Sequence, residues 1–371
     1  MKISCDREKL LAAFQTAAMV APSRSPKPIL QNVKLEVSDQ GAVLMATDME
    51  FGVRLSVPGV DIAKPGSAVL PVQRFNSILR ESSDDTLRIE GTDRGYVVKG
   101  DRSEFKLPAE NPDEFPNVAP FKEEKYHAVA APLFREIVTR TEFATDVESS
   151  RYALGGVLLE MEGDKILAVG TDGRRLAKME GPAEAVGGHS TADTQTIIRT
   201  QSMRLLGRAL SDADEQVHIS SRGNDVVLRT SRATFVSRLV EGRFPRWRDV
   251  FPRRQDAVRI DMNVGPFYSA LRQAAVVASD DSRGIDFDFG SGSLVLTARN
   301  ANLGESRVEM PIPYDGQVIG VTLDHKFVAD FLKVLKAEQP FQLEIENAEA
   351  AALFTTEDGY AYVLMPLARD R

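Results

Sequence analysis

The sequence predicts an α+β fold made of three repeated domains, and three observations lead to it. The chain has 371 residues, a length that suits two or three domains. A helix followed by alternating strands recurs three times along the chain. Short polar and glycine-containing turns join these strands, which favours antiparallel sheets covered by helices on one face.

The first unit opens with a helix at residues 7–20, where Leu10, Phe14 and Ala17 fall on one helical stripe. A proline-rich turn follows, and the next segments alternate apolar and polar residues as strands do. The other elements predicted in this unit are strands at 33–37 and 42–48, a second helix at 72–81, and a strand pair at 86–90 and 95–99.

The same order of elements returns twice. In the second unit we expect helices at 133–144 and 200–210 and strands at 156–161, 166–172, 216–220 and 225–230. In the third we expect helices at 266–278 and 324–336 and strands at 284–289, 294–298, 341–346 and 351–355. Each unit closes on a proline, and linkers rich in proline and charge lie near 117–125 and 251–257. The predicted domains are therefore 1–120, 126–251 and 257–371.

Composition limits the class of protein. The net charge of -8 argues against a protein that grips nucleic acid by bulk positive charge, although local basic faces remain possible. A single cysteine, Cys5, rules out an intrachain disulfide and suits a reducing compartment; we expect it to be a small buried residue. The first residues do not resemble a signal peptide, and no apolar run is long enough for a membrane span. We expect a cytoplasmic protein without membrane contact.

The sequence shows no constellation typical of catalysis. The four histidines lack metal-binding spacing, and no phosphate-binding loop is present. Thr171-Asp172 could serve carboxylate chemistry, but Thr47-Asp48 repeats it in the first unit, which favours a structural turn. We therefore expect no enzyme, no metal and no cofactor.

Four segments resemble one family: "KPILQN" (27–32), "TDGRRLA" (171–177), "LVEGRFPRWRDVFP" (239–252) and "YVLMPLARDR" (362–371). The resemblance is to the bacterial DNA polymerase III beta subunit, the beta sliding clamp, and it extends over essentially the whole chain. It implies a homodimer of head-to-tail chains that forms a ring, with helices lining a central hole and sheets outside. It also implies a nucleoid-associated DNA sliding clamp, or processivity factor, that encircles double-stranded DNA independently of base sequence. Its partners would be the DNA polymerase III alpha subunit, the clamp loader, and other polymerases and repair proteins with clamp-binding peptides.

A ring around DNA makes a prediction about charge. Phosphate contacts carry no sequence information, so a mildly basic bore suffices once DNA is enclosed. The predicted helices do carry cations, namely Arg7, Lys9, Arg74, Arg80, Arg135, Arg140, Arg204, Arg208, Arg272, Lys326, Lys333 and Lys336. The alternative is that these are ordinary solvated helix faces. The predicted DNA-facing residues are Arg74, Arg80, Arg204 and Arg208, joined by resemblance by Arg24, Arg151 and Tyr152.

The resemblance also implies a cleft between the second and third domains that binds partner peptides. The matching residues are Leu154, Thr171, Gly173, Arg174, Arg175, Leu176, Pro245, Val250, Val363, Leu364, Met365, Pro366 and Leu367. We expect Arg175 to lay its stem on apolar surface with its charged head in water. Taken alone, Leu154, Leu176 and Val363 read equally as core residues. Arg174 and Asp249 depart from the family, which commonly has His and Arg at these positions, so the preferred peptide should differ.

The dimer interface implied by the resemblance joins the first domain of one chain to the third domain of the other. Its residues would be Phe105 and Leu107 on an edge strand, with Val276 and Val277 at the end of a helix. An ordinary amphipathic strand is the alternative for residues 104–107. For the whole chain, the alternative function is a non-catalytic ligand-binding repeat protein without a DNA role.

Overall fold

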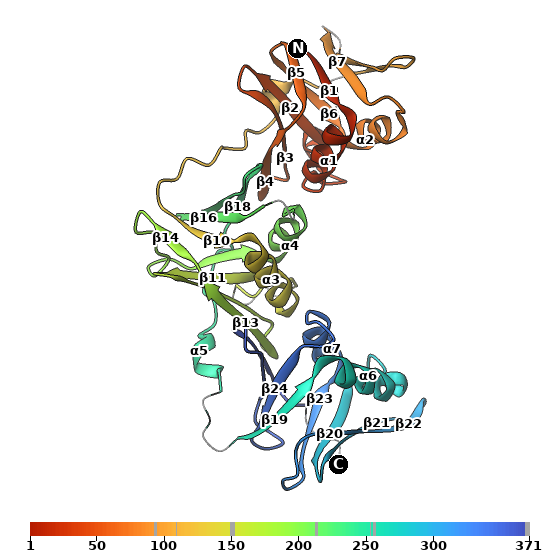
Figure 1. Cartoon of the computed structure of the whole chain (residues 1–371), viewed down its shortest axis with the longest axis vertical. Helices are drawn as coiled ribbons and strands as arrows, with labels where there is room; N and C mark the ends of the chain where they lie inside the picture. The colour runs from red at the N-terminus through yellow and green to blue at the C-terminus, as the bar shows by residue number, and fades with distance from the viewer. Residues whose placement is uncertain are drawn as a thin grey trace. The chain divides into compact units, whose positions relative to one another are not determined.

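The computed structural model describes residues 1–92, 95–108, 110–148, 153–211, 214–252, 254 and 257–367. The chain forms two compact units (Figure 1). The N-terminal unit contains Met1–Phe134 and Ala183–Leu239, and the C-terminal unit contains Arg135–Pro182 and Val240–Arg371. The second repeat therefore contributes strands to both units.

The first repeat begins with a strand and a helix, continues through strands to a second helix, and ends with three strands. Its elements are β1 (Lys2–Asp6), α1 (Arg7–Ala18), η1 (Pro28–Gln31), β2 (Asn32–Ser38), β3 (Gly41–Thr47), β4 (Phe51–Val57), β5 (Val60–Lys64), β6 (Gly66–Pro71), α2 (Val72–Glu81), β7 (Thr86–Thr92), β8 (Gly95–Lys99), β9 (Glu104–Leu107) and η2 (Pro112–Glu114).

The second and third repeats follow the same order. The second has β10 (Tyr126–Ala130), α3 (Ala131–Thr141), η3 (Glu142–Ala144), β11 (Gly156–Glu162), β12 (Lys165–Thr171), β13 (Arg175–Pro182), β14 (Glu184–Val186), β15 (Thr196–Arg199), α4 (Thr200–Ala209), β16 (Gln216–Arg222), β17 (Asp225–Arg229) and β18 (Ala233–Arg238), followed by α5 (Trp247–Val250). The third has β19 (Val258–Asn263), α6 (Val264–Ala274), η4 (Ala275–Val277), β20 (Gly284–Gly290), β21 (Ser293–Asn300), β22 (Gly304–Pro311), β23 (Ile319–Asp324), α7 (His325–Lys333), β24 (Pro340–Ile345), β25 (Ala352–Thr355) and β26 (Tyr360–Leu364).

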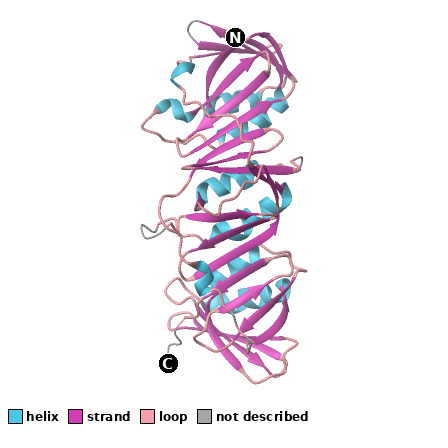
Figure 2. Cartoon of the chain, turned by 90° about the vertical axis from the view of Figure 1, so that its left-hand side faces the viewer, coloured by secondary structure: helices cyan, strands magenta, loops and turns pink. Residues whose placement is uncertain are grey.

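The predicted threefold α+β repeat is confirmed, and each predicted helix is present. Some helices end earlier than expected, because their last residues tighten into 3-10 turns at η3 and η4. Figure 2 shows how strongly strands predominate in the chain. In the described residues, no helix has the length and apolar character that crossing a membrane requires.

All strand pairs with a described register are antiparallel, and they join neighbouring repeats in a regular way. In the N-terminal unit one sheet has the order β5-β1-β7-β8-β9, and the other runs β14-β10-β16-β17-β18-β4-β3-β2-β6. In the C-terminal unit one sheet has the order β22-β21-β20-β23, and another contains the run β11-β12-β13-β26-β25-β24-β19. The last strand of the second repeat thus pairs with β4 of the first, and the last strand of the third pairs with β13 of the second.

Aromatic side chains anchor the helices on their sheets. In the N-terminal unit, Phe14 of α1 meets Phe75 of α2 with ring centroids 4.8 Å apart. In the C-terminal unit, Phe331 of α7 lies 5.0 Å from Phe354 and 5.6 Å from Tyr360, again between ring centroids. All five side chains are buried. Such burial typically contributes about 1.5–3 kcal/mol for each large apolar side chain, so these contacts hold α1 against α2 and α7 against its sheet.

Candidate functional site

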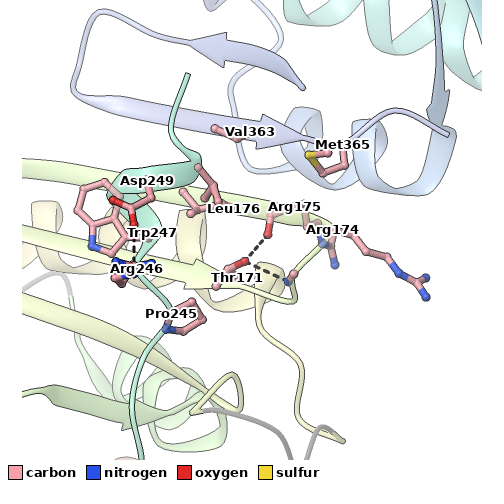
Figure 3. A pocket seen from close by; sticks show the side chains of 12 residues that line it. Thr171, Arg174, Arg175, Leu176, Pro245, Arg246, Trp247, Asp249, Val363 and Met365 are labelled. Carbon is pink, nitrogen blue, oxygen red and sulfur yellow. Dashed lines mark hydrogen bonds and ion pairs between the residues drawn. The ribbon is translucent and has the colours of Figure 1, made fainter. Parts of the chain in front are cut away.

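A cavity of about 350 Å³ lies in the C-terminal unit (Figure 3). Three segments form it: the turn between β12 and β13, the segment around α5, and the end of β26. Its lining residues are Thr171, Gly173, Arg174, Arg175, Leu176, Pro245, Arg246, Trp247, Asp249, Val250, Val363 and Met365. The site therefore draws on both the second and the third repeat.

Side chains of the turn hold its own backbone in place. The Thr171 hydroxyl donates to the carbonyl of Arg175 at 2.7 Å and accepts the amide of Gly173 at 3.1 Å. Asp172 accepts the amides of Arg174 and Arg175 at 2.9 and 3.0 Å. This arrangement is an Asx turn, and it requires a positive φ of 87° at Gly173, which glycine adopts without strain. Thr171-Asp172 is thus structural, as the repetition in the sequence indicated.

Arg175 is a buried anchor beneath the cavity, and the prediction that its charged head stays in water is wrong. Its guanidinium donates to Asp172 at 2.9 Å, to Asp330 at 2.8 Å and to the carbonyl of Phe143 at 2.8 Å. It also stacks over the ring of Phe327, 4.2 Å from the centroid. Paired carboxylates and an aromatic face replace the lost hydration of the buried cation. Arg175 therefore ties the turn to α7.

The cavity has an apolar floor and a partly exposed apolar rim. Leu176 and Val363 are buried, whereas Val250 is 61% and Met365 48% exposed. Trp247 opens α5 and is almost buried, with its indole N–H 3.5 Å from Glu160. Exposed large apolar side chains around a concave surface are typical of a binding site rather than of a core.

The charges at the rim are unevenly compensated. Arg246 and Asp249 form an exposed ion pair with 3.1 Å between nitrogen and oxygen. Arg174 is exposed, and no carboxylate of the described residues forms an ion pair with it. In Figure 3, Arg174 lies at the Met365 end of the cavity, whereas Asp249 lies beside Trp247 at the other end.

The structure brings most of the predicted cleft residues together, but four do not line the cavity. Leu154 and Leu364 are buried side chains outside it. Pro366 follows the cavity wall, and the amide of Leu367 bonds to the carbonyl of Thr322 at 2.8 Å. Arg246 and Trp247 were missed as lining residues, and Asp249 was noted only as a departure from the family. The sequence signal for them was the single tryptophan of the chain, which stands between Pro245 and Pro252.

The first repeat contains a counterpart of this turn. Thr47 and Asp48 make the same hydrogen bonds to Met49, Glu50 and Phe51, and Met49 takes the positive φ of 79°. A cavity of about 240 Å³ adjoins this turn in the N-terminal unit.

The counterpart cavity differs from the cleft at two equivalent positions. Gly52 stands where the cleft has Leu176, and its Cα lies so close to Val118 that an added Cβ would be 3.1 Å from that side chain. The buried Val118 therefore fills the floor from the linker. Glu50 stands where the cleft has Arg174, and it pairs with Arg199 at 3.1 Å and Arg238 at 3.8 Å.

The predicted DNA-facing arginines are exposed wherever the structure describes them. Arg74 and Arg80 lie on α2, Arg204 and Arg208 lie on α4, and Arg24 lies in the loop before η1. Arg151 and Tyr152 lie outside the described residues.

Two other helix cations contradict the prediction of a basic surface. Arg140 is 6% exposed and pairs with Asp358 at 2.8 Å. Arg7 turns inward, and its guanidinium donates to the carbonyls of Asp84 and Leu79. Both side chains stabilise packing between elements and do not contribute to a charged helix surface.

The predicted dimer residues lie on exposed features of their own units. Phe105 is 37% exposed on β9, the edge strand of its sheet, and Leu107 ends that strand half-buried. Val276 is 77% exposed in η4, beside the half-buried Val277.

Reactive groups are few in the described part of the chain. Cys5 is buried, as expected, and burial together with the nearby charge of Asp6 raises the pKa of its thiol to about 12. The described residues contain no group of three or more His, Cys, Asp or Glu placed to hold a metal ion.

Comparison with known proteins extends over nearly the whole chain. Models of the N-terminal, central and C-terminal domains of the DNA polymerase III beta subunit match residues 1–119, 128–246 and 248–368. The beta sliding clamp of Pseudomonas aeruginosa is 30% identical, over 99% of this chain and 100% of the relative. That of Escherichia coli is 27% identical with the same coverage.

Solved structures agree in fold. The DNA polymerase III subunit beta of Pseudomonas aeruginosa aligns with a TM-score of 0.90 at 28% identity, over 99% of this chain and 100% of that one. A sliding clamp from the same organism, solved bound to griselimycin, aligns with a TM-score of 0.92 over the full length of both chains, also at 28% identity. The three matched domains and the full-length relatives show that the chain belongs to the DNA polymerase III beta subunit family, the beta sliding clamps.

Proposed function

We propose that this chain is a DNA sliding clamp, a non-catalytic processivity factor that encircles duplex DNA and tethers partner proteins through the cleft. The observation that carries the proposal is the regular strand pairing between repeats. The last strand of a repeat pairs with the third strand after the first helix of the preceding repeat, as β18 does with β4 and β26 with β13. Two strands, β9 and β22, lack such a partner in the part of the chain that the structure describes, and each lies at the edge of its sheet.

The two leftover edges make a head-to-tail ring the natural closure. β9 is the last strand of the first repeat and β22 is the third strand of the third repeat, and among the described residues neither has the inter-repeat partner that β18 and β13 have. A second copy of the chain supplies both missing partners at once, which closes the assembly and removes the edges. Phe105 and Leu107 on β9, with Val276 and Val277 beside β22, would be buried in this interface.

DNA would lie within the ring, against exposed cations of the helices. Arg24, Arg74, Arg80, Arg204 and Arg208 are proposed to face it, together with Arg151 and Tyr152. Enclosure supplies retention, so these residues need only weak and sequence-independent phosphate contacts. The net charge of -8 for the chain then discourages DNA from adsorbing elsewhere.

The cleft is proposed as the docking site for peptides of partner proteins. The DNA polymerase III alpha subunit, the clamp loader, and other polymerases and repair proteins are the proposed partners. The apolar floor with the exposed Val250 and Met365 supports this role, because methionine adapts to varied ligands. We retain Leu154, Leu364, Pro366 and Leu367 as residues that shape the cleft walls from outside the cavity.

We further propose the domain boundaries 1–120, 126–251 and 257–371 and a nucleoid-associated, cytoplasmic location. The family-model boundaries at 119 and 128 lie within two residues of the proposed limits, whereas those at 246 and 248 lie five and nine residues before them.

The test is retention on closed DNA. Purified chain is loaded onto a nicked circular plasmid by its clamp loader with ATP, and bound protein is separated by gel filtration. We expect the protein to stay on the circle and to be lost when a restriction enzyme linearises it, since a ring slides off a free end. Equal retention on circular and linear DNA would contradict enclosure. Absence of loading together with specific binding of a small ligand would favour a ligand-binding repeat protein.

The cleft is tested separately by Val250→Ala with Met365→Ala. Both side chains are exposed, so the double variant should fold and dimerise normally. Binding to the immobilised alpha subunit should weaken at least about tenfold, since two apolar contacts of roughly 1 kcal/mol each are lost. Unchanged binding by surface plasmon resonance would contradict this site. The control is Met49→Ala with Val236→Ala, which removes two apolar side chains that line the counterpart cavity.

A further inference from the structure

We infer that the cleft selects peptides that carry an acidic side chain next to their apolar residues, and that Arg174 is the residue that selects them. The inference rests on the proposed function and adds to it the charge of the preferred partner peptide. Four charged residues line the cavity, namely Arg174, Arg175, Arg246 and Asp249.

Three of these four charges are already compensated. The Arg175 guanidinium contacts the carboxylates of Asp172 and Asp330 beneath the surface. Arg246 and Asp249 compensate each other at the rim. Arg174 lacks an ion pair with any carboxylate of the described residues, so its positive charge is the one available to a ligand.

In the counterpart cavity, the charge of the residue equivalent to Arg174 is compensated by ion pairs. There Glu50 replaces Arg174, and Arg199 and Arg238 both pair with it. In the cleft, the residue equivalent to Arg238 is Met365, which carries no charge. The cleft therefore combines an apolar wall with a cation that no carboxylate of the described residues neutralises.

The positions of the charges give the peptide a direction. Arg174 lies at the Met365 end and Asp249 at the Trp247 end, with Leu176 and Val363 between them (Figure 3). A carboxylate at the Met365 end is attracted by Arg174, whereas a charged group at the Trp247 end gains little, because Arg246 and Asp249 already pair with each other. The apolar side chains of the peptide would fill the floor between the two ends. An exposed ion pair of this kind contributes little affinity but discriminates against the opposite charge.

The experiment uses the full-length dimer and three capped, fluorescein-labelled peptides. Each has the core Leu-Ala-Leu-Phe, flanked on both sides by Asp, by Asn or by Lys. Fluorescence anisotropy at low ionic strength should give the affinity order Asp, Asn, Lys for the unaltered protein. Arg174→Glu should weaken the Asp peptide about threefold to tenfold and reverse the order. Asp249→Asn should strengthen the Asp peptide severalfold.

The control is Arg248→Glu, because Arg248 is an exposed neighbour whose guanidinium binds Glu160 and which does not line the cavity. It should leave the order of the three peptides unchanged. The preference should also shrink at high salt, where exposed charges are screened. An order that Arg174→Glu does not alter overturns the inference while leaving the cleft proposal intact, provided that the Asn peptide binds. Failure of all three peptides to bind the unaltered protein overturns both.

Discussion

Arg175 shows how one side chain can hold a binding site together. Its guanidinium alone donates hydrogen bonds to Asp172 in the β12–β13 turn, to the carbonyl of Phe143 and to Asp330 of α7. Arginine suits this position because its planar fork can donate in several directions at once. Its neighbour Arg174 is exposed on the same turn, so adjacent arginines differ: Arg175 is structural, and Arg174 is the residue proposed to recognise a ligand.

We expect Arg175→Ala to lower the free energy of unfolding by about 3–5 kcal/mol, because Asp172 and Asp330 lose their buried partner. Arg175→Lys should recover only part of this loss, since an ammonium group cannot span all three acceptors. Urea unfolding of the three proteins measures the difference. Arg174→Ala is the matched control and should change stability by less than about 0.5 kcal/mol. A fully stable Arg175→Ala protein would show that the cluster does not stabilise the fold.

His127 and His189 form a buried pair in the N-terminal unit, with 2.7 Å between their Nδ1 atoms. The Nε2 atom of His189 accepts the amide of Ser221, so its proton is expected at Nδ1, where it is donated to His127. A protonated His189 would lose this arrangement. Burial, and then the neighbouring His127, lower the pKa of His189 to about 4.

This pair predicts a loss of stability in acid. Because the folded pKa of His189 lies below the unfolded value of about 6.5, the unfolded state takes up more protons between these two values. Stability is therefore complete above pH 6.5 and falls as the pH drops towards 4, by on the order of 2 kcal/mol at pH 5. His189→Gln should be less stable at pH 7 but should lose less between pH 7 and 5. Parallel losses in urea unfolding would contradict a contribution from His189.

At the scale of elements, the edge strands β9 and β22 are the proposed sites of assembly. The three Asx turns at Asp48, Asp172 and Asn300 make Phe51, Arg175 and Leu303 equivalent residues. Phe51 pairs with Ser237 and Arg175 with Leu364. The equivalent residue on β9 is Leu107, so in the proposed dimer we expect Leu107 of one chain to lie opposite Leu303 of the other. Leu303 is 56% exposed, as expected for an apolar residue that a second chain would cover in the dimer.

We expect Phe105→Arg to weaken the dimer on the order of 100-fold or more, because the interface would bury an unpaired charge. Leu303→Asp should weaken it too if the register derived from the repeat holds. The control is Val318→Asp, an exposed apolar residue beside β23 at the opposite edge of the sheet that contains β22. Sedimentation velocity across a concentration series reports the monomer fraction. A dimer that survives Phe105→Arg would contradict this interface.

At the scale of the whole molecule, the distribution of charge matters more than its sum. The net charge of -8 coexists with exposed arginines on α2 and α4. A protein that holds DNA by enclosure needs positive charge only where the duplex passes.

Replacing Arg74, Arg80, Arg204 and Arg208 together by Glu should reduce clamp loading and clamp-dependent synthesis at least about tenfold at low salt, because the bore would repel phosphate. The dimer should persist. A variant with Lys64, Arg88, Lys122 and Lys165 changed to Glu has the same net charge and alters exposed strand and loop positions instead. Equal loss of synthesis in the two variants would indicate a general charge effect and contradict a DNA-facing role for α2 and α4.

The sequence by itself determined the local elements and their repetition. Apolar periodicity is a local property, so it predicted α1, α2 and their counterparts, and the paired Thr-Asp residues predicted matching turns. Strands β4, β13 and β22 were missed. Charged residues interrupt the apolar pattern of β13 and β22, and β4 and β13 each pair on one side with a strand of a later repeat, which no local pattern contains. The one-turn helix α5 is too short for periodicity to reveal.

Only the tertiary structure decided which charges are buried and which are free. Arg140 and Arg175 look like surface residues in the sequence, but Asp358 and Asp330 reach them from the third repeat. Arg174 differs from Arg175 by one position, yet the turn directs it into solvent. Whether a charge is neutralised depends on which groups lie beside it in space. The sequence does not give the distances between residues that are far apart along the chain.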